Sequence, residues 1–193
     1  MDKQQVRRGR LQFMLIAALF LGPLVVAMVL YYSDLDWRPS GYSNHGALLL
    51  PVVNVVEPLG DDENAQALQG SWSLLYISSD DCAADSDCRA QLYALRQIRL
   101  MLGKNMDRLQ RVLLHAGPSI DPGYLASEQG GLVLLRNAHL RSVLLSAYPP
   151  GNAANGYFLL DPLGNLVMYF PPDLNPRDIV SDIKHLLSLS HIG

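Results

Sequence analysis

The stretch that decides the fold is SWSLLYISSDDCAADSDCRAQLYALRQIRLMLG, residues 71–103. Its first part, 71–79, mixes aromatic and aliphatic side chains, as buried strands do. Its last part, 89–103, spaces apolar residues three and four positions apart, which predicts an amphipathic helix ended by a glycine. Between the two lie the only cysteines of the chain, Cys82 and Cys88. The stretch therefore predicts a strand, a cysteine-bearing loop and a helix in succession.

Hydrophobic periodicity and turn residues predict further elements on both sides of this stretch. Strands are expected at 47–53, 108–115, 132–135, 157–160 and 166–170, the last two forming a hairpin around a Pro- and Gly-bearing turn. Helices are expected through Leu140, Val143 and Leu144 and over 175–189. Residues 61–69 are expected to be a surface turn, and 117–131, with two prolines and four glycines, mostly loop. This order predicts an α/β domain with a central mixed sheet and helices on both faces.

An uncharged apolar run, LQFMLIAALFLGPLVVAMVLYY, occupies residues 11–32. A helix of about 20 residues spans the hydrocarbon layer of a bilayer, which is about 30 Å thick. Basic residues (Lys3, Arg7, Arg8 and Arg10) precede the run, and Asp34 and Asp36 follow it. By the positive-inside rule, the N-terminus is expected in the cytoplasm and the rest of the chain on the periplasmic side of the inner membrane.

A cleaved signal peptide is the alternative to an anchor. Its apolar core would have roughly 7–15 residues and would precede an A-x-A-like cleavage site. This run is longer, and Ala27-Met28-Val29 matches such a site poorly. An uncleaved anchor is therefore favoured. The expected organisation is a basic tail at 1–10, a transmembrane anchor at 11–32, a stalk at 33–46 and one domain at 47–193.

Composition excludes some classes of function. The formal net charge is −3 over 193 residues, and no basic stripe with interleaved aromatic residues is present, so no nucleic-acid partner is expected. No Ser/His/Asp arrangement, phosphate-cradling loop or paired-carboxylate signature is found. If the protein were an enzyme, thiol–disulfide oxidoreduction would be the expected reaction.

Four short blocks carry a resemblance to a known family: GALLLP at 46–51, WSLLY at 72–76, the cysteine pair, and YFLLDPLG at 157–164. Their order resembles the thioredoxin fold and, within it, the membrane-anchored Sco/SenC proteins of cytochrome c oxidase assembly. The likeness extends over roughly 45–193 in element order. It implies a thioredoxin-like accessory factor that handles thiols or copper, with oxidase subunits or other assembly factors as partners.

The chain also departs from that family. Sco proteins use a Cys-x-x-x-Cys pair and a distal histidine shortly before the Asp-Pro-x-Gly hairpin. Here Cys82 and Cys88 are six positions apart, and the corresponding segment, 151–156, contains no histidine. Among the family's copper ligands, only the two cysteines have counterparts. A thioredoxin-like scaffold that binds partners without chemistry of its own is therefore the alternative function.

Three roles remain open for Cys82 and Cys88. They could form a structural disulfide, because the non-cytoplasmic side is oxidising. A redox pair would need a lowered thiol pKa, which the four aspartates of the loop disfavour, and five intervening residues are expected to leave no tight turn at a helix end. As metal ligands, two thiolates suit Cu(I), although a further ligand would be needed.

His115 is the candidate for that third ligand. It ends the predicted strand 108–115, and neighbouring parallel strands end at the same sheet edge, so it could approach the cysteine loop. The simpler alternative is a histidine whose hydrogen bonds are satisfied at a strand end. His139 is expected at the surface or as a helix cap. No role is assigned to His45, His185 and His191.

Overall fold

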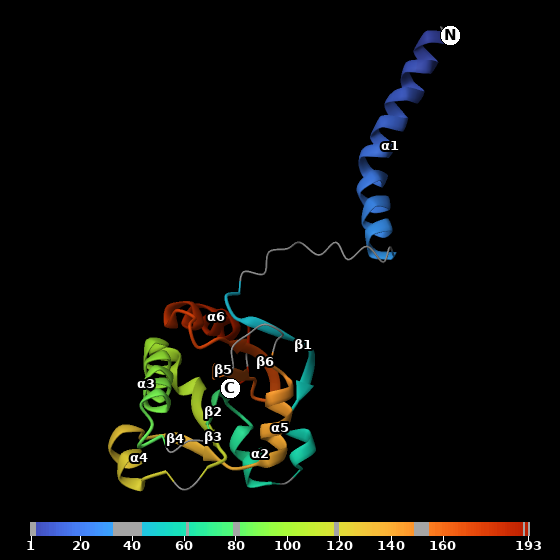
Figure 1. The fold of residues 1–193 in the computed structure, drawn as a ribbon. Helices are drawn as coiled ribbons and strands as arrows, with labels where there is room; N and C mark the ends of the chain where they lie inside the picture. The colour runs from blue at the N-terminus through green and yellow to red at the C-terminus, as the bar shows by residue number, and fades with distance from the viewer. Residues whose placement is uncertain are drawn as a thin grey trace. The chain divides into compact units, whose positions relative to one another are not determined.

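The structure is a computed structural model that describes residues 3–32, 44–60, 62–78, 82–117, 120–148, 155–190 and 192. The chain divides into two compact units, Met1–Tyr42 and Ser43–Gly193 (Figure 1). Most of the predicted stalk, residues 33–43, lies outside the described residues.

The first unit contains a single described element, helix α1, Lys3–Tyr32. Its segment Arg10–Val29 is long and apolar enough to cross a membrane, and none of that segment is buried against the protein. Among the described residues, no other helix meets this condition. The length and apolar composition of this segment are those of a membrane-spanning helix.

The second unit is built on a six-stranded sheet with the order β1-β6-β5-β2-β3-β4. Its strands are β1 (Ala47–Asn54), β2 (Trp72–Ser78), β3 (Leu109–His115), β4 (Leu132–Leu135), β5 (Tyr157–Leu160) and β6 (Asn165–Phe170). Strands β2, β3 and β4 are parallel, whereas β5 pairs antiparallel with both β2 and β6, and β6 pairs antiparallel with β1. The predicted mixed sheet is confirmed.

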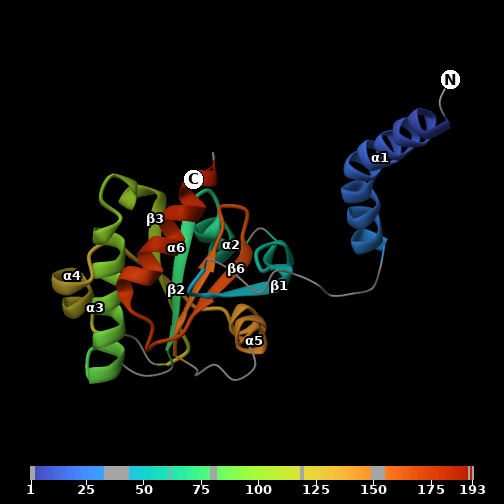
Figure 2. The same ribbon diagram turned by 90° about the horizontal axis from the view of Figure 1, so that it is seen from above.

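Helices cover both faces of this sheet. They are α2 (Glu63–Leu68), α3 (Ser86–Met101), α4 (Pro122–Glu128), α5 (Ala138–Ser146) and α6 (Pro176–Leu189), with short 3₁₀ turns at Glu57–Leu59 and Gly103–Arg108. Apolar residues of α3, α4 and α6 share one core cluster, and those of α2 and α5 share the other. Figure 2 shows α3 and α6 on one side of the sheet and α5 on the other.

Strand β2 explains why two cores form. All seven of its residues are buried, as expected for a central strand with both faces covered. Leu74 and Tyr76 belong to the cluster with α3, whereas Leu75 and Ile77 belong to the cluster with α5. This alternation follows from the two-residue period of a strand.

Two segments that were predicted to lack regular structure are helical. Residues 61–69 contain α2, whose first turn is capped by the carboxylate of Asp62 accepting from the Asn64 N–H. Residues 117–131 contain α4, which Asp121 caps and which has Pro122 at its first turn. In both cases an aspartate satisfies amide groups that a helix start leaves unpaired. The turn-like composition therefore marks the start of a helix rather than its absence.

The predicted hairpin between β5 and β6 is confirmed. The Asp161 carboxylate accepts hydrogen bonds from the Leu163 N–H at 2.9 Å and the Asn165 N–H at 2.8 Å. Gly164 adopts φ +82°, and a Cβ at this position would overlap the side chain of Val56. A glycine is therefore required here both by backbone conformation and by packing.

Candidate functional site

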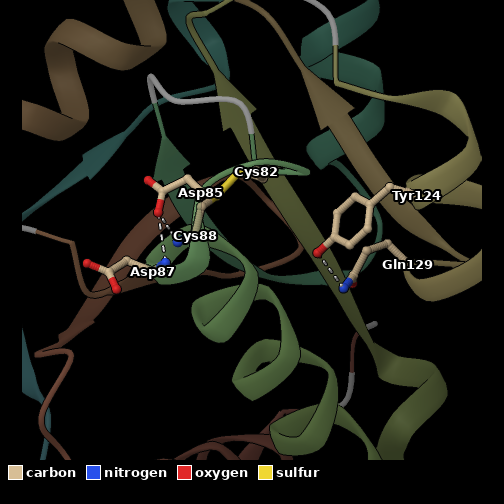
Figure 3. Close-up of a disulfide and its surroundings, with 6 residues drawn as sticks. All are labelled: Cys82, Asp85, Asp87, Cys88, Tyr124 and Gln129. Atoms are coloured by element: carbon tan, nitrogen blue, oxygen red, sulfur yellow. Dashed lines mark hydrogen bonds between the residues drawn. A yellow bond between two sulfur atoms is a disulfide. The ribbon is translucent and has the colours of Figure 1, made fainter.

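Cys82 and Cys88 form a disulfide at the carboxyl end of the central strand β2 (Figure 3). Cys82 follows the end of β2 by four residues, and Cys88 is the third residue of α3. The bond thus joins the loop after a central parallel strand to the first turn of the following helix. Ligands and reactive groups of α/β proteins commonly gather at this edge of a sheet.

Helix α3 begins at Ser86, three residues before the predicted start at 89, and Asp85 is its N-cap. Its Oδ1 accepts hydrogen bonds from the Asp87 N–H at 2.8 Å and the Cys88 N–H at 3.4 Å (Figure 3). The expectation that no tight turn could hold both sulfurs at a helix end is therefore wrong. The aspartate that seemed to crowd the thiols instead caps the helix that carries one of them.

Both cysteines belong to the hydrophobic core. Cys82 is 0% exposed and Cys88 2% exposed, and they share a cluster with Tyr124 of α4. The guanidinium carbon of Arg89 lies over the Tyr124 ring, 5.3 Å from the ring centroid. In this oxidised state the sulfurs are bonded to each other and buried, so they do not ligate a metal ion until the bond is reduced, and a reducing thiol must first gain access to one of them.

A tyrosine fixes the helix behind the disulfide. The Tyr157 hydroxyl of β5 donates toward the Gln91 carbonyl oxygen of α3 at 3.2 Å and also contacts the Gln91 side-chain oxygen. Burial raises the pKa of Tyr157, with a smaller contribution from Tyr76, whose ring centroid lies 6.0 Å away. The phenol therefore stays protonated as a donor, and it ties α3 to the sheet one turn after Cys88.

His115 ends β3 beside the end of β2, as predicted. It pairs with Ser78 in the parallel register, and the Ala116 N–H donates to the Ser78 carbonyl oxygen at 3.0 Å. The side chain is buried, at 3% exposure. The chain therefore brings His115 to the sheet edge from which the cysteine loop departs.

The histidine and the disulfide line neighbouring cavities rather than one. Cys88, Asp85 and Asp87 line a cavity of about 200 Å³, whereas His115 lines one of about 490 Å³, and the two share Arg141 and Leu145 of α5. Within the described residues, no group of three or more His, Cys, Asp or Glu side chains is placed to hold a metal ion. Ligation by His115 together with the two cysteines thus remains a prediction about the reduced protein.

Sequence reasoning missed a polar cluster at the start of the second unit. The buried carboxylate of Asp182 in α6 accepts from the His45 N–H at 2.8 Å, the Gly46 N–H at 2.8 Å and His45 Nδ1 at 2.9 Å. The hydrogen bond to Asp182 raises the pKa of His45. His45 had been assigned no role. One signal existed, because Asp182 occupies a position of the apolar stripe of α6, beside Ile179 and Ile183.

His139 and the helix cap can also be placed. His139 is an exposed residue of the first turn of α5, and the cap of that helix is Asn137, whose side chain accepts from the Leu140 N–H. Of the two expectations for His139, surface position is confirmed and capping is wrong.

An apolar N-terminal helix and a strand–cysteine–helix unit in a mixed sheet define a membrane-anchored, thioredoxin-like protein. Residues 72–190 match the family described as transmembrane-like, thioredoxin-like, C-terminal domain, and residues 3–34 match the transmembrane-like, N-terminal domain. The chain belongs to this transmembrane-like, thioredoxin-like family.

Solved structures with the same fold include Sco proteins, in agreement with the resemblance found in the sequence. Yeast Sco1 with copper bound aligns with a TM-score of 0.51 and 16% identity over 65% of this chain and 83% of that one. Arabidopsis thaliana ScoI with copper bound aligns with a TM-score of 0.51 and 14% identity over 65% and 89%. At these identities the likeness establishes the fold. The comparison with curated proteins found no match.

Proposed function

We propose that this protein is a membrane-anchored accessory factor for respiratory cytochrome oxidase assembly that handles thiols or copper(I) through Cys82 and Cys88. The observation that carries the proposal is the position of the pair, between the carboxyl end of β2 and the first turn of α3. The oxidase context is taken from the Sco/SenC resemblance, which is an argument by analogy. The anchor would leave the N-terminus in the cytoplasm and the domain on the periplasmic side, near membrane-bound oxidase subunits or other assembly factors.

Either activity begins with the same step. A partner dithiol attacks the Cys82–Cys88 disulfide through a mixed disulfide; two electrons and two protons pass to the pair, and the partner is left oxidised. The reduced cysteines can then return those electrons to another disulfide, or bind Cu(I) as cargo, because soft thiolates select that ion. The carboxylates of Asp85 and Asp87, which line the cavity beside Cys88, would attract a cation.

A scaffold without redox or metal chemistry is the second candidate, and the burial of both cysteines favours it. In that case the disulfide staples the loop after β2 to α3. The fold would then serve to present surfaces to partners at the membrane.

Copper binding separates these functions. The full-length chain, purified in a neutral detergent and reduced under anaerobic conditions, is titrated with Cu(I) against a chromogenic chelator. We expect one Cu(I) per chain for the reduced protein and none for the Cys82→Ser, Cys88→Ser double variant. If the reduced protein binds no more copper than this variant, copper handling is excluded and the scaffold is favoured.

Two histidine variants test the third ligand. We expect His115→Ala to weaken Cu(I) binding markedly, because two sulfurs rarely complete a site that must retain copper against competitors. His139→Ala, at the exposed start of α5, is the matched control and should weaken binding less. Equal binding by the wild type and His115→Ala would remove His115 from the site and leave the cysteines in it.

A further inference from the structure

A cavity beside the candidate site is lined by His115, Ala116 and Gly117 after β3, and by Arg136, Asn137, Ala138, Arg141, Ser142 and Leu145 of α5 and the loop before it. Its volume is about 490 Å³. Pockets that bind small molecules have volumes of roughly 300–1,000 Å³, so this cavity is large enough for a ligand. It lies where the parallel strands β3 and β4 end, the usual location of ligands in such sheets.

Two arginines give the polar part of the cavity wall its positive charge. Arg136 and Arg141 contribute two guanidinium groups, His115 contributes a buried imidazole, and none of the described lining residues carries a carboxylate. Acidic groups border this region: Asp62 of the α2 cap accepts from the Asn137 side-chain amide at 3.0 Å, and Asp85 and Asp87 line the neighbouring cavity that shares Arg141. His115 and Arg141 also interact with other groups of the protein, and a ligand would share them with those partners. Guanidinium groups bind carboxylates through paired hydrogen bonds.

The remaining wall is apolar, formed chiefly by Ala116, Ala138 and Leu145. Leu145 borders both this cavity and the one beside Cys88, and it is 41% exposed. A ligand that matches both halves carries one carboxylate and a short apolar body. Inorganic anions would use the arginines and leave the apolar half empty.

We infer that this cavity binds an organic carboxylate, with its oxygens at Arg136 and Arg141 and its apolar part against Ala116, Ala138 and Leu145. The carboxylate can come from a free short-chain acid or from the C-terminus of a peptide, since both present the same group on an apolar body. This site needs neither the thiols nor copper, so it goes beyond the function proposed above.

The test is an amide NMR titration of the ¹⁵N-labelled full-length chain in neutral detergent. Butyrate represents the free acid and N-acetylleucine the peptide C-terminus; butyramide and N-acetylleucinamide are their uncharged counterparts, and inorganic phosphate tests charge alone. We expect both acids to shift the amide resonances of Ala116, Gly117 and Ala138, and the two amides to leave them unchanged. Tighter binding of butyrate indicates a free acid as the natural ligand, and tighter binding of N-acetylleucine indicates a peptide.

Arginine variants make the assignment specific. We expect Arg136→Gln and Arg141→Gln each to weaken acid binding about fivefold or more, as the loss of one charge-assisted contact does. Arg136 is exposed, so its replacement leaves the fold intact, and Arg177→Gln on the exposed first turn of α6 is the control that removes the same charge elsewhere. Equal shifts by acids and amides, equal affinity of both arginine variants and the wild type, or phosphate binding as tightly as the acids would each overturn the inference.

Discussion

Replacement of the buried Asp182 of α6 by alanine should destabilise the second unit. The carboxylate is 5% exposed and accepts three hydrogen bonds, from the two successive N–H groups of His45 and Gly46 and from the His45 ring. Alanine offers none of these, and the N–H of buried Gly46 has no water to replace the lost acceptor.

The expected cost follows from counting the groups that lose a partner. The His45 ring is 44% exposed and can turn to water, so it contributes little. Each backbone N–H left without an acceptor costs about 1–2 kcal/mol, and two of them give a loss of about 3 kcal/mol in the free energy of unfolding. Both N–H groups donate to Oδ2 of Asp182, so Asp182→Asn can keep its amide oxygen at that place and should lose much less than Asp182→Ala.

Chemical unfolding of the full-length chain in neutral detergent, followed by tryptophan fluorescence, measures this loss. Asp178→Ala is the control, because Asp178 lies 3.8 Å from His45 Nε2 with its side chain 40% exposed, and exposed ion pairs contribute little to stability. A loss below about 1 kcal/mol for Asp182→Ala would refute the reasoning, since it would mean that water or another group satisfies both amides.

Three further predictions concern pH, the disulfide and topology. The hydrogen bond to Asp182 raises the pKa of His45 above its ordinary value of 6.5 in the folded protein. The stability that His45 contributes is therefore fully present below pH 6.5 and is lost as pH rises through the raised pKa. The stability difference between the wild type and His45→Gln should shrink with rising pH, and a growing difference would contradict this. The Cys82→Ser, Cys88→Ser variant should still fold with a loss of about 2 kcal/mol, because a six-residue separation closes little chain entropy, and a variant without cooperative unfolding would disprove it. A reporter active only outside the cytoplasm, fused after Gly193, should be active, and an inactive fusion would reverse the orientation.

The sheet and its major helices were predictable because their signals are local. Strand β2 is a nearly continuous run of apolar residues and helix α3 repeats them every three to four positions, and burial follows directly from those patterns. The short helices α2 and α4, of 6 and 7 residues, carry too few repeats to show a period. Their starts were visible only as Asp62 and Asp121, residues that favour turns as much as helix caps.

The position of the candidate site was predictable, and the disulfide was among the roles expected for its cysteines, whereas the helix cap beside it was not. Parallel pairing of β2 and β3 brings Cys82, Cys88 and His115 to one edge of the sheet, and this follows from element order. The aspartates of the loop suggested an environment unfavourable to thiolates, whereas Asp85 caps the helix that carries Cys88. Composition alone does not reveal this role. The contact between His45 and Asp182 joins residues 137 positions apart, so no local pattern could have indicated the pairing.

The burial of the disulfide affects the rate at which it can be reduced. A reductant or partner thiol must contact a sulfur atom, and neither Cys82 nor Cys88 offers one at the surface of the folded domain. The rate of reduction is therefore limited by how often the first turn of α3 opens, and it stops rising once the reductant is abundant. Between openings, the pair keeps the oxidation state that it had at the last opening, so its state lags behind a change in the surroundings.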